Sequence, residues 1–182
     1  MSKPKNPQPV KLITSVFSKT KESIASGIEK LSDTFGTIDF VSEIFPFNCT
    51  KYYEREMGEG LIRRFFSFQK MISPHRLPSI KLHTNRIEDD LSDFEGNREV
   101  NIDPGYISLS HLILATGKGY AHRPYLSEGI YADLTLLYKN KTFQALDWTY
   151  PDYKNLEIIE LMNTLRRKYV FQLQDLVSKE SC

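Results

Sequence analysis

The residues best suited to proton transfer and anion binding stand together in one loop-like stretch, Lys118-Gly119-Tyr120-Ala121-His122-Arg123. Histidine exchanges a proton near neutral pH, and arginine can hold a carboxylate or phosphate through two parallel hydrogen bonds. We therefore predict that Lys118 and Arg123 bind an anion and that His122 gives or takes a proton. A structural role for His122 and Arg123, in capping the loop, is the alternative that the sequence leaves open.

Two further carboxylates could complete such a site. The segment Tyr52-Tyr53-Glu54-Arg55-Glu56 lies in a turn-rich region, where Glu54 and Tyr53 could supply a general base and a hydroxyl donor. The same acids would also suit the first turn of a helix, because negative charge is favourable near a helix N-terminus. Asp133, on a predicted strand, is the other carboxylate that could orient His122. The catalytic candidates are therefore His122, Glu54, Tyr53 and Asp133.

Aromatic residues make up half of the predicted ligand-binding residues. The rings of Asp147-Trp148-Thr149-Tyr150-Pro151-Asp152-Tyr153 could close a pocket or stack on a base, although rings at this density also commonly fill a core. Besides Arg123 and Lys118, the predicted ligand-binding residues are Asp103, Tyr131, Trp148 and Tyr150. In a second hypothesis, Tyr131, Trp148 and Tyr150 form an exposed platform that binds RNA or a protein partner.

A third hypothesis is metal-assisted hydrolysis through His122, Asp103 and Asp133, which have suitable ligand atoms but no diagnostic spacing. The two cysteines, Cys49 and Cys182, do not have the spacing of a zinc site or a disulfide framework. The sequence contains no G-x-x-x-x-G-K-[ST], G-x-G-x-x-G, G-x-S-x-G or H-E-x-x-H motif. It therefore identifies neither a metal nor a cofactor, and the reaction stays open.

Length and composition limit the class of protein. The 182 residues have the size of one domain, and the 40% that are hydrophobic can form a conventional core. The 24 basic and 23 acidic residues leave a net charge of +1, which argues against a strongly basic nucleic-acid-binding protein. The first residues lack the apolar run of a secretion signal, and no apolar run is long enough to span a membrane. We expect a cytoplasmic protein without a membrane partner.

The hydrophobic pattern predicts the elements that must position these residues. Apolar residues recur at helical spacing up to Gly36, which is well placed to end that helix: Ile24, Ile28, Leu31 and Phe35. The proline and glycine of Asp103-Pro104-Gly105-Tyr106 predict a type II turn. The predicted order is a strand at 10–17, the helix ending at 35, strands at 38–47 and from 65 toward 72, a helix from 78, a strand at 98–102, an undecided segment at 106–116, a hairpin at 129–138 and 142–148, and a helix at 155–176.

This order predicts one α+β domain. Its first six elements follow the βαββαβ order of a ferredoxin-like fold, and a β-hairpin and a C-terminal helix are added; helices would cover one face of a mainly antiparallel sheet. The domain would span residues 10–176, after a proline-rich lead at 1–9 and before a frayed tail at 177–182. A two-residue loop at Asn140-Lys141 would place Asp133 opposite Trp148 and Tyr131 opposite Tyr150, whereas a three-residue loop would change that pairing.

Short runs along most of the chain resemble a known family. They are Pro9-Val10-Lys11-Leu12, Phe45-Pro46-Phe47, Tyr52-Tyr53-Glu54 with Glu56-Met57-Gly58, Lys81-Leu82 with Thr84-Asn85, Asn101-Ile102-Asp103-Pro104-Gly105-Tyr106, His122-Arg123, Gly129-Ile130-Tyr131-Ala132 and Trp148-Thr149-Tyr150-Pro151-Asp152-Tyr153. In that order they resemble the bacterial family catalogued as domain of unknown function 4416. The resemblance implies no established activity. Some members are labelled GTP-binding, a label that the missing P-loop leaves without physical support in this sequence.

One of these runs departs from the family pattern. Where the family has Thr-Lys-Asp-Tyr-Ser-His-Arg, this chain has Thr116-Gly117-Lys118-Gly119-Tyr120-Ala121-His122-Arg123. The chain therefore has an extra glycine and lacks the acid and the serine, but it keeps the histidine and the arginine.

Overall fold

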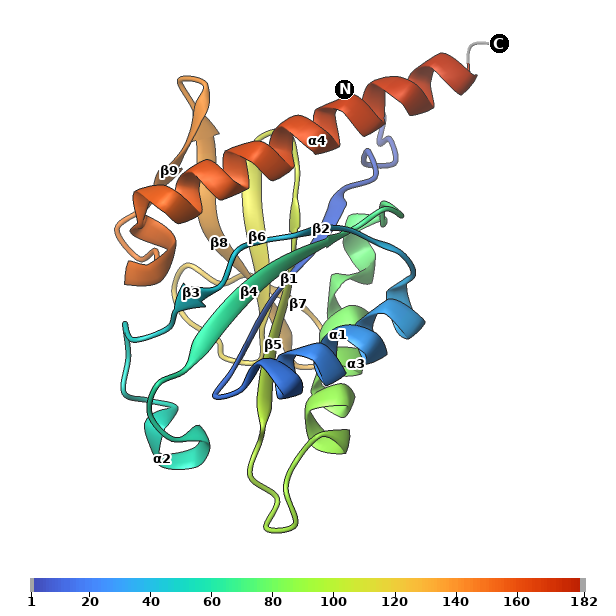
Figure 1. Ribbon diagram of the computed structural model, residues 1–182. Helices are drawn as coiled ribbons and strands as arrows, with labels where there is room; N and C mark the ends of the chain where they lie inside the picture. Colours follow the sequence, from blue (N-terminus) through green and yellow to red (C-terminus); the bar gives the residue numbers. More distant parts are fainter. Residues whose placement is uncertain (1, 181–182) are drawn as a thin grey trace.

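A single sheet forms the centre of the structure, a computed structural model that describes residues 2–180 (Figure 1). Within these residues the sheet has nine strands in the order β2-β4-β1-β5-β6-β8-β7, with β3 beside β4 and β9 beside β8. In chain order the elements are β1 (Lys11–Ser18), α1 (Lys21–Phe35), β2 (Ile38–Val41), β3 (Phe45–Pro46), α2 (Glu54–Met57), β4 (Ile62–Phe68), the 3-10 turn η1 (Pro74–Arg76), α3 (Leu77–Asp90), β5 (Val100–Ile107), β6 (His111–Thr116), β7 (Tyr125–Ser127), β8 (Ile130–Lys139), β9 (Thr142–Ala145), the 3-10 turn η2 (Pro151–Lys154) and α4 (Leu156–Glu180).

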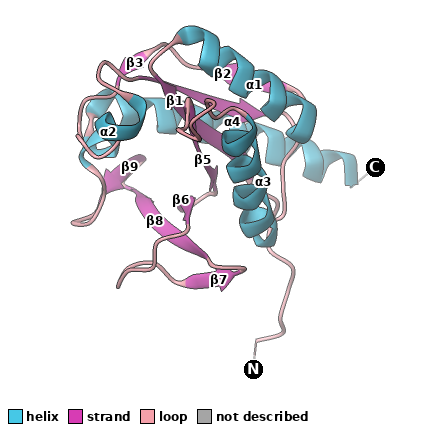
Figure 2. Cartoon of the chain, turned by 90° about the horizontal axis from the view of Figure 1, so that it is seen from below, coloured by secondary structure: helices cyan, strands magenta, loops and turns pink. Residues whose placement is uncertain are grey.

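The first part of the sheet interleaves two βαβ units. β1 and β2 are connected through α1 and lie on either side of β4, while β4 and β5 are connected through α3 and lie on either side of β1. All strand pairs are antiparallel. This interleaving is the split βαβ arrangement. Figure 2 shows how β6, β8 and β7 lead away from β5. The predicted α+β class, antiparallel sheet and C-terminal helix are confirmed.

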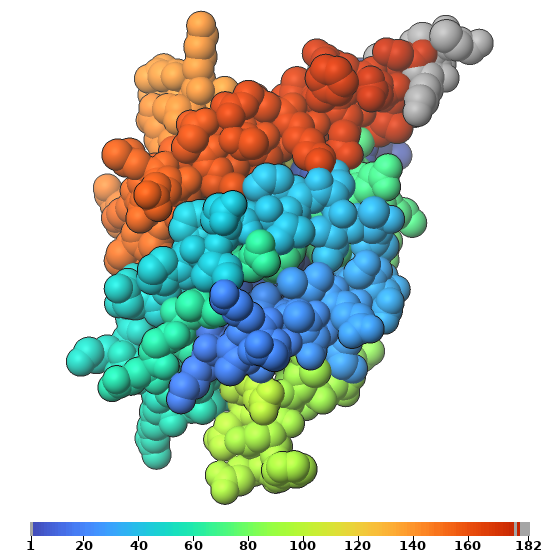
Figure 3. All heavy atoms as spheres, viewed as in Figure 1, coloured from blue at the N-terminus to red at the C-terminus, as the bar shows by residue number. Residues whose placement is uncertain are grey.

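Helices cover both faces of the sheet, so the prediction that they would cover one face was wrong. All eight residues of β1 are buried, because this central strand is packed on both sides. In Figure 1, α4 crosses above β4 and β1, whereas α1 and α3 lie below them. Figure 3 shows α4 packed directly against the β2–β3 segment, which is drawn in cyan.

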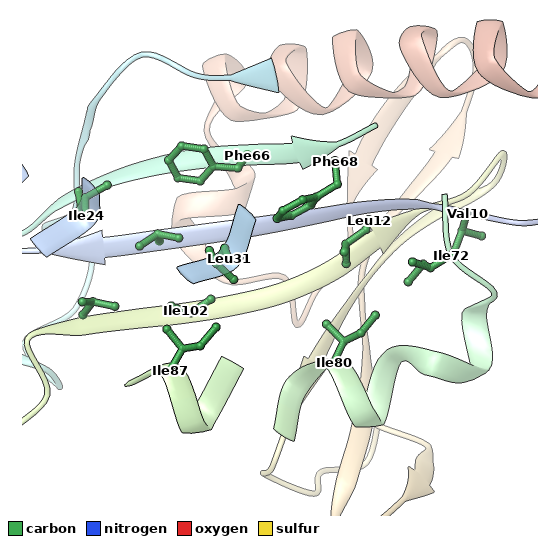
Figure 4. Packing of buried hydrophobic residues seen from close by; sticks show 12 residues of the cluster. Val10, Leu12, Ile24, Leu31, Phe66, Phe68, Ile72, Ile80, Ile87 and Ile102 are labelled. Carbon is green, nitrogen blue, oxygen red and sulfur yellow. The ribbon is translucent and has the colours of Figure 1, made fainter. Parts of the chain in front are cut away.

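Side-chain alternation along β1 divides the core in two. Leu12 and Val16 face α1 and α3, in the cluster drawn in Figure 4. Ile13 faces the other way and packs with Phe65 and with α4. Lys11, also on the α4 side, is fully buried, and its Nζ donates to Asp39 at 2.5 Å, to the Phe68 carbonyl at 2.7 Å and to Gln172 at 2.8 Å. This lysine therefore joins β1, β2, β4 and α4.

The type II turn predicted at residues 103–106 does not form, because these residues belong to the strand β5. Asp103, Pro104 and Gly105 lie opposite Ser15, Thr14 and Ile13 of β1. Glycine is needed at position 105 because β5 and β6 approach each other closely there, not because the chain turns. A Cβ atom at Gly105 would lie 2.4 Å from the Ile113 carbonyl oxygen of β6. β6 pairs with β5 only at residues 105–107, so the outer edge of β5 at 100–104 faces no strand.

The predicted hairpin forms with a two-residue loop. Asn140 and Lys141 have φ angles of 52° and 65°, and Lys139 lies opposite Thr142. The strand β9 ends at Ala145, however, so the cross-strand pairs predicted for Trp148 and Tyr150 do not form part of the sheet. A register shift also separates Leu134, which packs on the α3 side, from Leu136, which packs on the α4 side. Strict alternation along a regular strand would place both on one face.

Other boundaries also differ from the prediction. Residues 38–47 form two short strands instead of one, and the turn-rich region at 52–60 contains the short helix α2. The undecided segment at 106–116 contains the end of β5 and all of β6. The helix α4 extends to Glu180, into the predicted tail, whose last residues, 181–182, lie outside the described residues.

Candidate functional site

The loop at residues 117–124 is held to the sheet by an ion pair between Arg123 and Asp133. Asp133 is a buried residue of β8, and its Oδ2 accepts a hydrogen bond from Arg123 Nε at 2.8 Å. The two other nitrogens of the guanidinium donate to the Lys118 carbonyl at 3.2 Å and to the Tyr150 hydroxyl at 3.0 Å. Arg123 thus connects the start of the loop, the strand β8 and the segment before η2. All three of its nitrogens are engaged within the protein.

His122 is held in place by a ring stack. Its imidazole lies parallel to the Trp148 indole, with centroids 5.1 Å apart and an interplanar angle of 15°, and Tyr120 packs edge-on at 5.3 Å. The indole is itself fixed, because Trp148 Nε1 donates to the Leu134 carbonyl at 2.8 Å. His122 Nε2 is buried without a hydrogen-bond partner and lies 3.6 Å from Asp133 Oδ2.

This arrangement has the parts of an acid–base pair. A carboxylate beside one imidazole nitrogen favours a proton on that nitrogen, which leaves the other nitrogen to exchange a proton. A separation of 3.6 Å exceeds a hydrogen bond, but such contacts are commonly longer before substrate binds. The Asp133 carboxylate is also restrained on its other oxygen, which accepts from Thr135 Oγ1 at 3.2 Å.

Exposed rings surround the pair. Lys118 Nζ lies 4.3 Å from the centroid of the Tyr52 ring, so the loop also touches the segment before α2. Trp148 and Tyr150 are 41% and 52% exposed, although each has a polar atom bonded within the protein. Together with these two, the exposed aromatic residues of this region are Tyr52, Tyr120 and Tyr125. The region therefore offers flat apolar surfaces next to a lysine and a histidine.

Of two other predicted residues, Tyr131 lies beside this cluster and Glu54 lies apart from it. Tyr131 packs edge-on against Tyr125 at 5.3 Å, and its ring lies under Gly119, where a Cβ atom would approach the ring to 3.1 Å. Tyr131 thus supports the loop from below. Glu54 makes no hydrogen bond or ion pair with His122 or its neighbours; it lines a separate hollow of about 370 Å³ beside Phe47.

Tyr53 and Asp103 belong to a neighbouring polar region on the same side of the sheet. The Tyr53 ring packs against Phe17 at 4.8 Å, and burial raises the pKa of its hydroxyl, as does the nearby Asp103 carboxylate. Asp103 accepts from Asn101 Nδ2 at 3.0 Å. Tyr150 also raises the pKa of Tyr53, so the two regions are adjacent.

Sequence reasoning missed the arginines of this region. Arg98 makes two hydrogen bonds to the Glu56 carboxylate, at 2.7 and 2.6 Å, and these bonds are the main cause of its raised pKa. Arg63 of β4 is buried and forms an ion pair with Asp152 of η2. The available signal for Arg63 was its position two residues before Phe65, on the same face of β4, because a charged residue on a buried face is rarely without a partner.

The open edge of β5 is closed by side chains of α3. Lys81 Nζ donates to the Ile102 carbonyl at 2.9 Å, and Glu88 Oε1 accepts from the Ile102 N–H at 2.6 Å. These two side chains satisfy the backbone groups that a neighbouring strand would otherwise pair. Burial raises the pKa of Glu88 to about 7, although the nearby Lys81 ammonium acts to lower it.

Residues 2–180 contain no group of three His, Cys, Asp or Glu side chains that could hold a metal ion. In the same part of the chain, every helix is too short or too polar to cross a membrane.

The chain was compared with known proteins in three ways. The family model described as Domain of unknown function (DUF4416) matches residues 8–169. A search of curated proteins and a search of solved structures gave no match. The matched span contains the loop at 117–124, the strand β8 and the aromatic segment that follows β9.

Proposed function

This chain belongs to the DUF4416 family, and we propose that it binds an anionic small molecule, bearing a phosphate or a carboxylate, over the loop at residues 117–124. In this proposal His122 gives or takes a proton during hydrolysis or group transfer. The observation that carries it is the buried Asp133 carboxylate, which contacts both Arg123 and His122. Because Asp133 already balances the charge of Arg123, Lys118 is the cation left to contact the anion.

The residues then have distinct roles. Asp133 and Trp148 position the imidazole, and Arg123 acts as a positioning residue that holds the loop and Tyr150. The exposed rings of Trp148 and Tyr150 supply surfaces on which a planar part of the ligand can stack. Such a site would operate in the cytoplasm, where phosphorylated and carboxylated metabolites are abundant.

Binding is tested by thermal melting with nucleotides, sugar phosphates and dicarboxylates. A ligand present at 100 times its dissociation constant stabilises the fold by about 2.7 kcal/mol, which raises the melting temperature of a chain of this size by about 5–10 °C. Lys118→Ala should weaken that binding about tenfold. Lys139→Ala, which removes an exposed lysine near the hairpin loop, is the control and should bind normally. If no anion in the panel shifts the melting temperature, the proposal is wrong.

The role of His122 is tested by fluorescence, because Trp148 is the one tryptophan in the sequence. A protonated imidazole quenches an indole stacked on it, so the Trp148 emission should fall when acidification protonates the imidazole of His122. His122→Asn should abolish this pH dependence and keep anion binding, while abolishing turnover of any substrate found. A pH-dependent emission that is identical in the variant would contradict the proposed geometry.

The exposed rings also favour a second candidate function, an interaction module for RNA or for a protein partner. Aromatic side chains and arginine are enriched at the centres of such interfaces. In this case Trp148→Ala should abolish binding of the partner, and Lys118→Ala should have a smaller effect. Short single-stranded RNAs in the same melting panel separate the two candidates, because a shift with RNA and none with small anions would favour the interaction module.

A further inference from the structure

A groove lies between the first turns of α4 and the β2–β3 edge of the sheet, apart from the loop at 117–124 (Figure 3). It has a volume of about 600 Å³, and its apolar lining comes from both sides: Phe40, Val41, Phe45, Leu156 and Leu161. The Phe45 ring is fixed by an edge-on contact with Phe65 at 6.0 Å, whereas Val41 and Leu156 are 45% and 80% exposed. Apolar surface left open in this way marks a site of interaction.

The charged residues that line this groove, among residues 2–180, are all glutamates. Glu43 stands on the β2–β3 side, and Glu157 and Glu160 stand on α4. Glu160 forms an exposed ion pair with Arg167 at 3.0 Å. Glu43 and Glu157 take part in none of the ion pairs found in this part of the chain. The groove is therefore an apolar strip with a negative rim, which is complementary to an apolar segment that carries positive charge.

The chain itself contains such a segment at residues 2–9, Ser2-Lys3-Pro4-Lys5-Asn6-Pro7-Gln8-Pro9, which has three prolines, two lysines and no acid. Prolines at this density favour the extended polyproline II conformation. Segments with two prolines three positions apart dock in apolar, aromatic-lined grooves, because their conformation is already formed before binding. Residues 2–8 are exposed and belong to no helix or strand, and Figure 2 shows the segment extending away from the body. The segment is thus available to another molecule.

We propose that the proline-rich segment 2–9 of a second copy of this chain docks in the groove between α4 and the β2–β3 edge, and that two copies exchange these segments in a symmetric dimer. Pro4 and Pro7 of each copy contact the apolar strip of the other, and the neighbouring lysines lie beside Glu43 and Glu157. The exchange uses the same surface on both copies, so it closes at two. It involves no residue of the loop at 117–124 and therefore goes beyond the function proposed above.

The place where the segment leaves the body allows this exchange. The Pro9 carbonyl accepts from the Tyr169 hydroxyl at 2.8 Å, so the segment starts beside the middle of α4. The groove lies nearer the start of the same helix, at residues 156–164. Two copies with antiparallel α4 helices therefore bring each segment next to the groove of the other copy. An extended segment of this length reaches about 25 Å, compared with about 14 Å of helix between residues 160 and 169.

Sedimentation velocity of the full chain over a concentration series tests the proposal and should show a dimer that grows with concentration. Two charge reversals, Lys3→Glu/Lys5→Glu in the segment and Glu43→Lys/Glu157→Lys in the groove, should each raise the dissociation constant of the dimer at least about tenfold, because like charges then meet. Lys139→Glu/Lys141→Glu makes the same change in charge as the segment variant, at exposed positions of the hairpin loop. This control should dimerise normally.

Mixing the two charge-reversal variants distinguishes exchange between copies from docking within one chain. In the mixture the acidic segment of one variant meets the lysine-bearing groove of the other, and the basic segment of the second meets the unaltered groove of the first. A mixed dimer should therefore form with about the affinity of the unaltered protein. No rescue would occur if each segment docked in the groove of its own chain, and this result would overturn the proposal.

Three further results would also overturn it. A full chain that stays monomeric throughout the series forms no exchanged dimer. A dimer that both variants retain uses another surface, and a dimer lost only in the groove variant has a different occupant in the groove. All four substituted positions are exposed, so the melting temperatures of the variants should match that of the control. Lys118→Ala should leave the dimer unchanged, which separates this surface from the site proposed at the loop.

Discussion

Arg123 Nε donates to Asp133 Oδ2 at 2.8 Å, in a pair whose side chains are only 9% and 7% exposed. Removing one partner of a buried ion pair leaves the other charge buried and unpaired, which strongly lowers the free energy of unfolding. This loss is much larger than the difference in stability between the intact pair and a pair of apolar residues. This pair is also the link between the loop that carries His122 and the strand β8. Its loss should therefore affect both stability and the position of the imidazole.

Asp133→Asn should lower the free energy of unfolding by about 3 kcal/mol, because the Arg123 charge is left buried without a counterion. Urea denaturation measures the change. Glu160→Gln is the control, since Glu160 pairs with Arg167 at 3.0 Å in a bridge whose side chains are 65% and 64% exposed. That variant should lose far less stability, because solvent and salt screen an exposed ion pair. Equal losses in the two variants would show that the Arg123–Asp133 pair is no better shielded from water than the surface pair.

Gly105→Ala should destabilise the protein by about 3 kcal/mol, because the added Cβ would meet the Ile113 carbonyl at 2.4 Å and force β5 and β6 apart. Gly117→Ala is the control: nothing lies within 4 Å of its Cβ position, and its φ angle is not positive. The control should change the free energy of unfolding by less than about 0.5 kcal/mol. A mild effect of Gly105→Ala in urea denaturation would mean that the two strands can separate without loss of packing.

The same glycine shows where sequence patterns mislead. Pro104-Gly105 predicted a turn because proline and glycine suit one locally, yet the residues stand in a strand for a reason that depends on the neighbouring strand β6. Helix caps and apolar periodicity predicted the helices more accurately. Helical spacing ended by Gly36 predicted α1, and Pro78 lies in the first turn of α3, because caps and periodicity act within a few residues.

For the candidate site, too, the sequence predicted what depends on local patterns and missed what depends on long-range packing. Residue types identified His122 and Arg123, and strand alternation placed Asp133 on β8, so the cluster itself followed from local information. The ion pair between Arg63 and Asp152 joins residues 89 positions apart. It depends on the order of strands in the sheet and on the placement of η2, neither of which a local pattern specifies. The separation of Glu54 from His122 has the same origin.

Lys141→Gly should stabilise the protein by about 0.5 kcal/mol, because Lys141 has a φ angle of 65° in the two-residue loop and glycine adopts that conformation without steric cost. Thermal melting and urea denaturation both measure the change. Lys139→Gly, at the end of β8, is the matched control and should lower the free energy of unfolding by about 0.5–1 kcal/mol. A loss of stability in Lys141→Gly would show that the flexibility gained by the unfolded chain outweighs the strain removed from the turn.

Glu88 should make the stability depend on pH in the range where most carboxylates no longer titrate. Its pKa is raised from 4.5 to about 7 in the folded protein, so between these values the folded state holds a proton that the unfolded state releases. The contribution of Glu88 to stability is therefore full below about pH 4.5 and is lost as the pH rises through 7. From pH 5 to pH 8 this loss amounts to about 2 kcal/mol.

Glu88→Gln removes the titrating group while an amide oxygen remains to accept from the Ile102 N–H. The free energy of unfolding of this variant, measured in urea, should gain about 2 kcal/mol over that of the unaltered protein between pH 5 and pH 8. Glu157→Gln, at an exposed position in the first turn of α4, removes the same charge and should show no such gain. If the two proteins keep a constant difference across this range, the Glu88 carboxyl is ionised throughout, and Lys81 and Arg98 at 3.8 Å compensate fully for its burial.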